Sequence, residues 1–345
     1  MGRHKKLTLS CLGGAVALFL CNGVWGPFVE AKSKKSQGVK IEELDGKMRV
    51  VLDGEPFTEL VWKDTAKPIL YPVLGPHAVP MTRNYPMKKD VEGEAKDHPH
   101  HRSLWFTHGD VNGVDFWGEG RGRGQIVHKE CVAFEGGPKE GWVTTRNEWV
   151  GPGDEIQCTD TRTMSFRSGK NCKMIDFVIT IYASHGKVVF GDTKEGSMGI
   201  RTHPALRLMK DPKAGVTSSN GKAVNSEGDR GPFGIWGKRA RWVDYWGDID
   251  GKVVGIAIFD HPENPRHPTW WHARQYGLVA ANPFGVHHFE KKPDGTGDLE
   301  VEAGKEITFR YRFVFHEGDV ETAKVDKLYG EYAESHPDLK GLKQE

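Results

Sequence analysis

Net charge, cysteine and long apolar runs are all scarce in this sequence. The 345 residues hold 48 Lys and Arg against 47 Asp and Glu, so the formal net charge is +1. A chain without a basic excess lacks the electrostatic footprint of a nucleic-acid-binding protein. Beyond the N-terminus, no apolar run approaches the ~20 residues of a membrane span. The sequence also contains no phosphate-binding glycine loop and no nucleophile elbow. These absences argue against a nucleotide-dependent enzyme and a serine hydrolase.

The first 31 residues are predicted to be a cleaved signal peptide. A basic start, MGRHKK, precedes an apolar stretch over Leu7–Leu20, and Val29-Glu30-Ala31 places small residues where a signal peptidase cuts. An uncleaved anchor is the competing interpretation, and Gly13 and Gly14 within the stretch weaken it. Cleavage predicts a secreted or periplasmic protein that has no membrane span. A polar linker is predicted over residues 32–40.

The mature chain has too few cysteines for a network of disulfide bonds to hold its fold together. Of the five cysteines, three follow the predicted cleavage site: Cys131, Cys158 and Cys172. In an oxidising compartment they allow one disulfide at most, and the likeliest pair is Cys158 with Cys172. No CxxC motif is present, so a cysteine-based zinc site is not indicated. We expect all three thiols to lie away from the functional site.

The mature chain alternates apolar and polar residues in a way that predicts half-buried antiparallel strands. Over Ile175–Tyr182 the apolar residues occupy every second position, and the same holds for Ile307–Phe315, where Thr308, Arg310 and Arg312 would face outward. The 43 glycines agree with many turns. Further strands are predicted over Met48–Leu52, Glu59–Trp62, Trp142–Glu148, Lys187–Phe190, Leu206–Met209 and Val253–Phe259.

One segment alone looks helical. Over Asp319–Ser335, Asp319 can cap the first turn, apolar residues recur at helical spacing, and Pro337 follows the end. Lys210–Arg230 is rich in Gly, Ser and Lys and is predicted to be a mobile surface loop. We therefore predict an all-β protein, a large antiparallel β-sandwich with one C-terminal helix, as a single domain over residues 41–345.

Nine of the 16 histidines lie in four clusters. The first spans residues 97–117 and begins DHPHHRS; the others are RTHP at 201–204, HPTWWHAR at 267–274 and NPFGVHHFE at 282–290. Binding residues commonly lie on loops held by a rigid scaffold. We expect the four loops to meet at one end of the sandwich, with the Cα atoms of Arg102, Arg201, His272 and His287 mostly within about 15 Å of one another.

These residue types suit sugar chemistry. Aromatic faces stack on sugar rings, while His exchanges protons near neutral pH. We expect His101 or His203 to act as acid/base with Glu290 as partner. The other candidates, predicted to bind substrate, are His100, Arg102, His108, Asn112, Asp115, Trp117, Arg201, Trp271, His272, Arg274, His287 and His288.

A metal is the alternative use of the same histidines. Neutral imidazoles can bind a divalent metal, and His100, His101, His203 and His287 are the candidate ligands. The HPHH segment lacks the i, i+4 spacing of a helical zinc motif. If that segment is extended, His100 and His101 point to opposite sides and only one faces inward. We therefore favour a site without a cofactor.

Four segments resemble a known family: HPHHRSLWFTHGDVNGVDFWGEG, RTHPALRL, HPTWWHARQYGLVAANPFG and HHFE. They look like the PmoA-like domain-of-unknown-function family, over roughly Lys40 to Glu334. Some descriptions call that family methane oxygenase PmoA, a name that belongs to a polytopic helical membrane subunit and does not suit this chain. The ending LEVEAGKEITFRYRFVF is similar to galactose-mutarotase-like super-sandwiches, which bind sugars.

Together the residues and the resemblance suggest an exported carbohydrate-active protein. The first hypothesis is an enzyme of the epimerase, lyase or hydrolase type that acts on a sugar or modified glycoside by His/carboxylate acid–base chemistry. The second is a metal-dependent oxygenase or lyase that uses the same histidines. The third is a non-catalytic sugar-binding sandwich. The expected partner is a small-molecule or oligosaccharide ligand, and not nucleic acid.

Overall fold

The computed structural model describes residues 38–212 and 219–342. The predicted signal peptide and residues 32–37 of the predicted linker lie outside the described residues. The first strand begins at Val39. No helix in the described ranges is long and apolar enough to cross a membrane.

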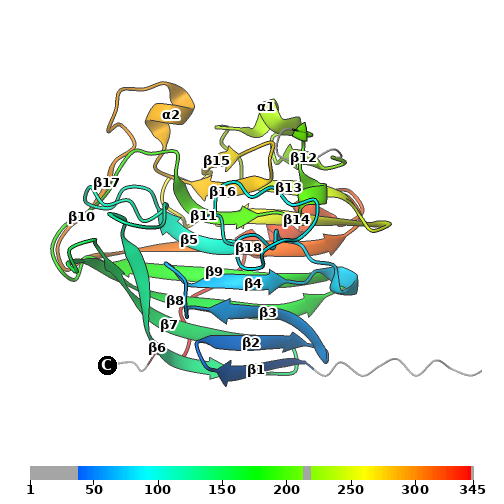
Figure 1. Cartoon of the computed structure of the whole chain (residues 1–345), viewed down its shortest axis with the longest axis horizontal. Coiled ribbons are helices and arrows are strands. Elements are labelled where there is room, and N and C mark those ends of the chain that lie inside the picture. Colours follow the sequence, from blue (N-terminus) through cyan, green and yellow to red (C-terminus); the bar gives the residue numbers. More distant parts are fainter. Residues whose placement is uncertain (1–37, 213–218, 343–345) are drawn as a thin grey trace, which may run out of the picture. The chain divides into compact units, whose positions relative to one another are not determined.

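Two eight-stranded antiparallel sheets dominate the described chain, which confirms the predicted all-β class (Figure 1). In spatial order, sheet 1 consists of β1 (Val39–Leu44), β2 (Lys47–Leu52), β3 (Glu55–Val61), β4 (Ile69–Val73), β5 (Leu104–His108), β11 (Gly196–Arg201), β16 (Leu278–Asn282) and β15 (Trp270–Ala273). Sheet 2 consists of β12 (Lys222–Asn225), β13 (Trp242–Ile249), β14 (Lys252–Asp260), β18 (Glu306–Glu317), β9 (Cys172–Tyr182), β8 (Ile156–Gly169), β7 (Gly141–Val150) and β6 (Gln125–Glu135). A third, two-stranded sheet pairs β10 (Val188–Phe190) with β17 (Leu299–Val301).

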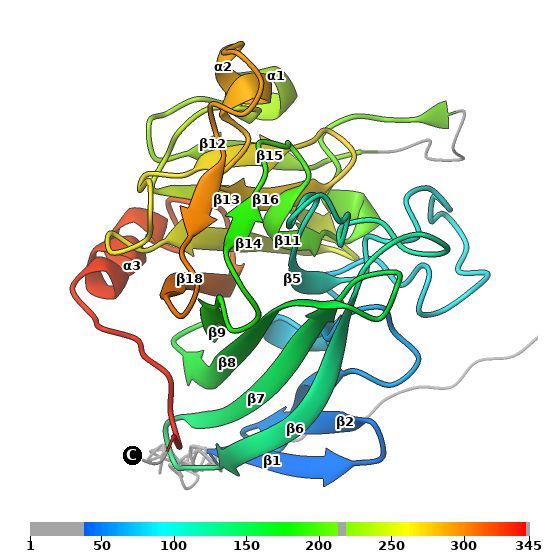
Figure 2. The same cartoon turned by 90° about the vertical axis from the view of Figure 1, so that its left-hand side faces the viewer.

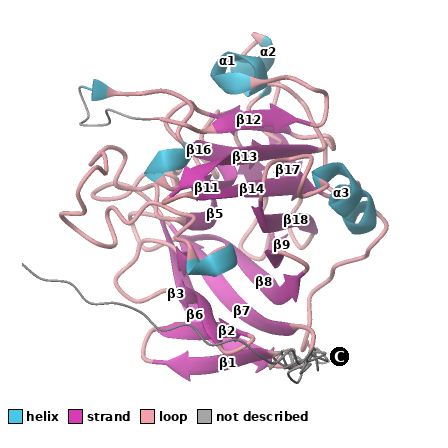
Figure 3. Ribbon diagram, turned by 90° about the vertical axis from the view of Figure 1, so that its right-hand side faces the viewer, coloured by secondary structure: helices cyan, strands magenta, loops and turns pink. Residues whose placement is uncertain are grey.

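The main core lies between the two large sheets, and β1 and β2 lie beside β6 and β7 at one end (Figures 2 and 3). Phe106 of sheet 1 meets Phe177 and Phe309 of sheet 2, with ring centroids 6.2 and 6.1 Å apart. Each fully buried aromatic residue contributes about 1.5–3 kcal/mol by leaving water. Apolar residues on one face of every strand therefore hold the sandwich together.

The strict alternation of β9 and β18 correctly predicts two antiparallel strands, but not half-burial. Ile175, Phe177 and Ile179 face the core as expected. The opposite face is also buried, because α3 and the C-terminal segment cover it (Figure 2). There Arg312 Nη2 donates to Asp176 at 3.0 Å, and its guanidinium lies 4.3 Å from the ring of Tyr332. Alternation with a period of two residues thus distinguishes the two faces of a strand, but it does not show that either face is exposed to solvent.

The helical prediction is partly right. Helix α3 spans Val325–Ala333, so it begins six residues later than predicted. Asp319 does cap a turn, since its Oδ1 accepts a hydrogen bond from Thr322 N at 2.9 Å. Two further short helices, α1 (Gly231–Ile235) and α2 (Val286–Glu290), lie together beyond β15 (Figure 1), so the prediction of a single helix is wrong. Five residues are too few to show a helical period.

Several local predictions also need correction. Leu206–Met209 is not a strand: Pro204–Leu206 forms a 3₁₀ turn, which the side chain of His203 caps by accepting from Ala205 N. The segment predicted as a loop over Lys210–Arg230 contains β12, which pairs with β13. The remaining predicted strands are present with slightly different ends.

The predicted disulfide is absent, and Cys131, Cys158 and Cys172 are all free. Strands β8 and β9 form a long hairpin in which Cys172 lies opposite Gly169, while Thr159, next to Cys158, lies opposite Tyr182. The two sulfurs therefore belong to opposite ends of the hairpin, about ten residues apart at ~3.3 Å each. A disulfide needs Cα atoms within roughly 7 Å.

Candidate functional site

A cavity of about 500 Å³ gathers the histidine-rich segments on the outer face of sheet 1. Its lining consists of His98, His100, His101, Asp115, Trp117, Gly118, Glu119, Arg123, Lys194, Glu195, His272, Arg274, Tyr276 and Leu278. Two of the four predicted clusters, residues 97–117 and 267–274, supply half of these residues. The loops therefore meet on a sheet face and not at one end of the sandwich.

Strand order explains why these segments meet. β11 lies between β5 and β16, and β15 follows β16, so Trp105, Gly199, Ala280 and His272 are opposite one another across four strands. Their chain neighbours belong to the main core, so these four residues share the outer face. A Cβ at Gly199 would lie 3.0 Å from the Trp105 indole. The small residues in this row leave room for the larger ones on either side.

The HPHH segment turns sharply and is not extended. His101 N donates to His98 O at 3.0 Å, and Arg102 N donates to His100 O at 3.1 Å. His98 itself has φ 45°, in the left-handed region that non-glycine residues adopt rarely. As a result His100 and His101 both line the cavity, and the expectation that one of them points away is wrong.

Four parallel rings form a stack along the cavity. In order they are Tyr276, His98, His101 and Trp105, with successive ring centroids 5.0, 4.7 and 5.5 Å apart. His100 meets His101 edge-on at 4.5 Å. Trp105 and His101 are each 1% exposed, so the stack runs from the open cavity into the protein.

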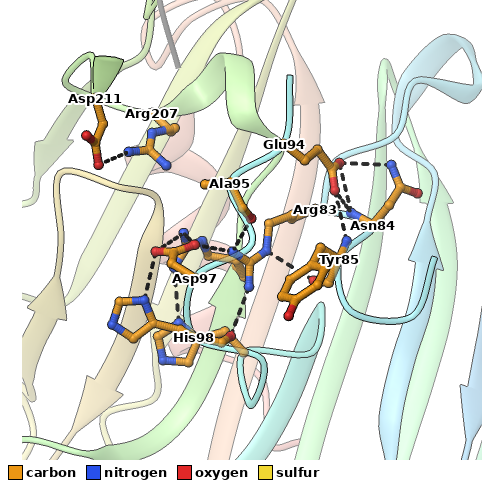
Figure 4. A network of polar contacts seen from close by, with 11 residues as sticks. Arg83, Asn84, Tyr85, Glu94, Ala95, Asp97, His98, Arg207 and Asp211 are labelled. Atoms are coloured by element: carbon orange, nitrogen blue, oxygen red, sulfur yellow. Dashed lines mark hydrogen bonds and ion pairs between the residues drawn. The ribbon is translucent and has the colours of Figure 1, made fainter. Parts of the chain in front are cut away.

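Asp97 holds this stack in place (Figure 4). Its carboxylate accepts hydrogen bonds from Arg83, from His98 Nδ1 at 2.7 Å, and from Arg201 Nη2 at 2.8 and 3.0 Å. Burial acts to raise the pKa of the Asp97 carboxyl, but the hydrogen bond from His98 and the charge of Arg201 outweigh it, so the pKa lies well below its usual range. Asp97 is therefore an anion that orients His98.

His98 and His101 present opposite hydrogen-bonding capacities. His98 Nδ1–H donates a hydrogen bond to the Asp97 carboxylate. With the ring proton on Nδ1, Nε2 is an acceptor, and it has no hydrogen-bond partner among the described residues. His101 Nδ1 lies 3.1 Å from Arg201 Nη1 and must accept, because a guanidinium only donates. Its proton is consequently on Nε2. Burial and then the charge of Arg201 lower the pKa of His101 well below its usual value, so the ring is neutral.

The carboxylates of the lining each have a cation. Glu119 binds buried Lys67 at 2.7 Å and Arg102 at 2.8 Å, whereas Asp115 binds Arg123 and Glu195 binds Lys194. Burial tends to raise the pKa of Glu119, but Lys67 and Arg102 lower it overall. The same Lys67 charge adds to burial at His100, whose pKa falls to about 4. These pairs fix the lining before any ligand binds.

Two groups at the far side of the cavity are left unsatisfied. His272 is 4% exposed, and its Nδ1 is buried without a hydrogen-bond partner. Burial lowers the pKa of His272 to about 4, so the ring is neutral. Nε of Arg274 is likewise buried without a partner, and the guanidinium has no carboxylate partner among the described residues. Buried polar groups in proteins are normally paired.

Several predicted site residues lie elsewhere. His108 is buried, its Nε2 lies 2.8 Å from Gly191 O, and burial lowers its pKa to about 4. Trp271 faces the main core and donates from Nε1 to Ala240 O. Asn112 accepts from Val189 N at the surface, and His203 caps the 3₁₀ turn. These four side chains have structural partners and do not line the cavity.

The fourth cluster is also directed away from the cavity. On α2, His287 Nδ1 lies 2.6 Å from Lys292 O, and Glu290 accepts from Trp270 Nε1 at 3.0 Å. Neither these residues nor His288 lines the cavity. Of the four alternative metal ligands, His100 and His101 meet in the cavity, whereas His203 and His287 do not line it. Within the described ranges no group of three or more His, Cys, Asp or Glu is arranged to hold a metal ion.

The structure adds residues that the sequence did not single out. His98 and Asp97 stood inside the first cluster, and their contribution follows from the turn. Tyr276 directly follows the third cluster. Lys194 and Glu195 carried no signal in the sequence, because only the pairing of β5 with β11 brings the chain just before β11 to the cavity.

A larger cavity of about 890 Å³ lies beside α3 and contains none of the predicted site residues. Lys170, Lys252 and Lys324 line it, and all three are exposed. It lacks the neutral imidazoles and the stacked rings of the smaller cavity. The smaller one is therefore the candidate site.

Fold and site together define an all-β sandwich protein with a histidine-rich cavity on one sheet. The model of a family described as "Family of unknown function (DUF6807)" matches residues 47–330, and the chain belongs to that family. This description does not carry the PmoA name that the resemblance suggested. A search of curated proteins gave no match.

Solved structures offer weak likenesses. A glycoside hydrolase family 97 enzyme from Pseudoalteromonas sp. strain K8 is 11% identical, with a TM-score of 0.33, over 81% of this chain and 34% of that one. This chain thus spans about a third of that enzyme. A galactose mutarotase related enzyme from Lactobacillus acidophilus is 10% identical, with a TM-score of 0.28, over 81% of this chain and 97% of that one. A galactose mutarotase-like protein from Lactobacillus casei ATCC 334 is 8% identical, with a TM-score of 0.30, over 81% of this chain and 100% of that one. At these scores they carry no argument about activity.

Proposed function

We propose that this protein is an exported carbohydrate-active enzyme that moves a proton on a sugar bound in the cavity. One observation carries the proposal: a carboxylate-oriented imidazole, His98, is stacked on a second imidazole, His101, whose ring proton is on Nε2. A proton acceptor and a hydrogen-bond donor thus lie side by side. Asp97 fixes the first and Arg201 fixes the second.

The cavity suits a sugar in size and lining. Its volume of about 500 Å³ falls within the range of small-molecule sites. Trp117 and Tyr276 contribute aromatic rings to the lining, and the polar groups around them are spread along the wall. Such a spread matches the hydroxyl groups of a ring, whereas a metal site requires donors that converge on one point.

The chemistry that fits is proton transfer next to a carbonyl group. His98 Nε2 would remove a proton from a sugar carbon adjacent to the carbonyl, and the electron pair would move to the carbonyl oxygen. His101 Nε2–H would donate a hydrogen bond to that oxyanion, as a neutral imidazole can. His98 then returns the proton to the former carbonyl carbon, while the hydroxyl proton of the adjacent carbon passes to the oxyanion, so that the carbonyl group moves by one carbon and the isomerisation is complete. The catalytic functions assigned to His203 and Glu290 from the sequence thus pass to His98 and Asp97.

Deuterium exchange tests this function. The protein is incubated in D₂O with D-glucose, D-galactose or D-glucuronate, and loss of a carbon-bound proton is followed by NMR. We expect exchange with at least one sugar, and the variant His98→Gln should slow it by about 10²–10⁴-fold. His185→Gln is the matched control, because His185 is exposed and bonded to Ser184.

Two results would contradict the proposal. One is exchange that His98→Gln leaves unchanged while circular dichroism shows a native fold. The other is sugar binding without exchange of any proton, which would indicate the non-catalytic sugar-binding alternative.

Export rests on the basic start and apolar stretch of residues 1–31. Fusing these residues to alkaline phosphatase, which needs an oxidising compartment to form its disulfides, should give an active, processed enzyme in a bacterial host. An inactive fusion retained in the cytoplasm would contradict export.

A further inference from the structure

Charge is unevenly balanced within the candidate cavity. Three cationic side chains line it: Arg123, Lys194 and Arg274. Arg123 is paired with Asp115, and Lys194 is paired with Glu195. Arg274 has no carboxylate partner anywhere in the described part of the chain. The neighbouring imidazoles His100, His101 and His272 are neutral, so they neither compensate this charge nor add to it.

The surroundings of Arg274 are built and not a chance surface feature. Arg274 directly follows β15, two residues after His272, whose side chain faces the cavity from the buried end of that strand. The guanidinium carbon lies 5.7 Å from the ring of Tyr276, which belongs to the aromatic stack. Buried Nε of Arg274 and buried Nδ1 of His272 both lack partners. The cavity that contains His98 thus also contains one guanidinium nitrogen and one imidazole nitrogen without hydrogen-bond partners among the described residues.

We propose that the substrate is an acidic sugar, whose carboxylate or sulfate ester binds Arg274 while a neighbouring hydroxyl group binds His272. The inference rests on the proposed function, because it takes this cavity to be the sugar site. A guanidinium presents several N–H donors in a plane and recognises an anionic group through paired hydrogen bonds. A buried unpaired nitrogen favours ligands that supply the missing hydrogen bond. A neutral sugar would leave the Arg274 charge uncompensated.

Three ligands of matched size test the proposal by isothermal titration: methyl β-D-glucuronide, D-glucose 6-sulfate and methyl β-D-glucoside. We expect at least one acidic ligand to bind roughly 10- to 100-fold more tightly than the neutral glucoside. Preference for the glucuronide identifies a carboxylate, and preference for the sulfate identifies a sulfate ester. Either result supports the proposal.

Variants locate the effect. Arg274→Gln should abolish the preference, so that the acidic sugar and the neutral glucoside bind to the variant with similar affinities. Arg274→Lys, which keeps the charge but not the planar donors, should retain part of the preference. Arg121→Gln is the matched control: Arg121 is exposed on the same loop as Arg123 and outside the cavity lining, so the same charge change there should have no effect.

The possible failures are distinguishable. If acidic and neutral sugars bind equally well, or if Arg121→Gln removes the preference as fully as Arg274→Gln does, the acidic-sugar proposal is overturned and the sugar site stands. If none of the three ligands binds, while melting curves show that the protein is folded, the proposal falls together with the assignment of this cavity to sugar.

Discussion

Replacing Asp97 by Asn tests the organisation of the site most directly. The change removes one negative charge while Arg83 and Arg201, whose side chains are 2% and 1% exposed, remain buried. Loss of one partner from a buried ion pair typically costs about 3–5 kcal/mol. Arg83 keeps backbone carbonyl acceptors at Tyr85, Ala95 and His98, and Asp97 is itself 31% exposed. We therefore expect the free energy of unfolding to fall by about 2–4 kcal/mol.

Urea unfolding measures this loss. The midpoint should shift to lower urea with an unchanged slope, which indicates lower stability and not a different unfolded state. Asp90→Asn is the matched control, because Asp90 and its partner Lys96 are 81% and 61% exposed, and we expect no measurable shift. If Asp97→Asn destabilises the protein no more than Asp90→Asn does, Asp97 is not the centre of the site.

The same pair of proteins gives a pH dependence. The pKa of Asp97 is lowered in the folded protein, whereas an unfolded Asp has a pKa of about 3.9. Its contribution to stability is therefore fully present above roughly pH 5 and is lost as the pH falls below about 4. The difference in unfolding free energy between wild type and Asp97→Asn should be constant from pH 6 to 8 and shrink in acid. A difference that grows on acidification would refute the sign of the argument.

Two further predictions concern groups outside the cavity. Burial acts to lower the pKa of His316, but the charge and hydrogen bond of Asp244, 3.0 Å away, raise it overall. The difference in unfolding free energy between wild type and His316→Gln, measured by urea titration, should therefore decline as the pH rises from 6 to 9. A difference that stays constant would contradict an ion pair between His316 and Asp244. Burial raises the pKa of Cys131 to about 11 and that of Cys158 well above its usual value, so native protein at pH 8 should resist alkylation by iodoacetamide at both thiols until it is unfolded. A peptide linked through Cys158 and Cys172 in mass spectrometry would show that the hairpin register is wrong.

The class of fold and the segments that contribute to the site can be predicted from local sequence patterns. Alternation over Ile175–Tyr182 and Ile307–Phe315 fixes which side chains share a face, because successive residues of any strand point to opposite sides. The HPHH segment supplies His98, His100 and His101 to the cavity, and the cluster at 267–274 supplies His272 and Arg274. These are local properties, readable within a dozen residues of chain.

Which of those residues act together depends on how the strands pair in space. Arg201 reaches Asp97 and His101 because β11 pairs with β5, a contact between positions about a hundred residues apart. His108 on β5 is buried and contacts Gly191 O. His98, by contrast, has a left-handed backbone conformation that directs its side chain into the cavity. The identity of a side chain determines which groups it can bind. The strand order and the turn at His98 determine which groups lie close to it. A histidine-rich sequence can therefore predict acid–base chemistry without showing which histidines perform it.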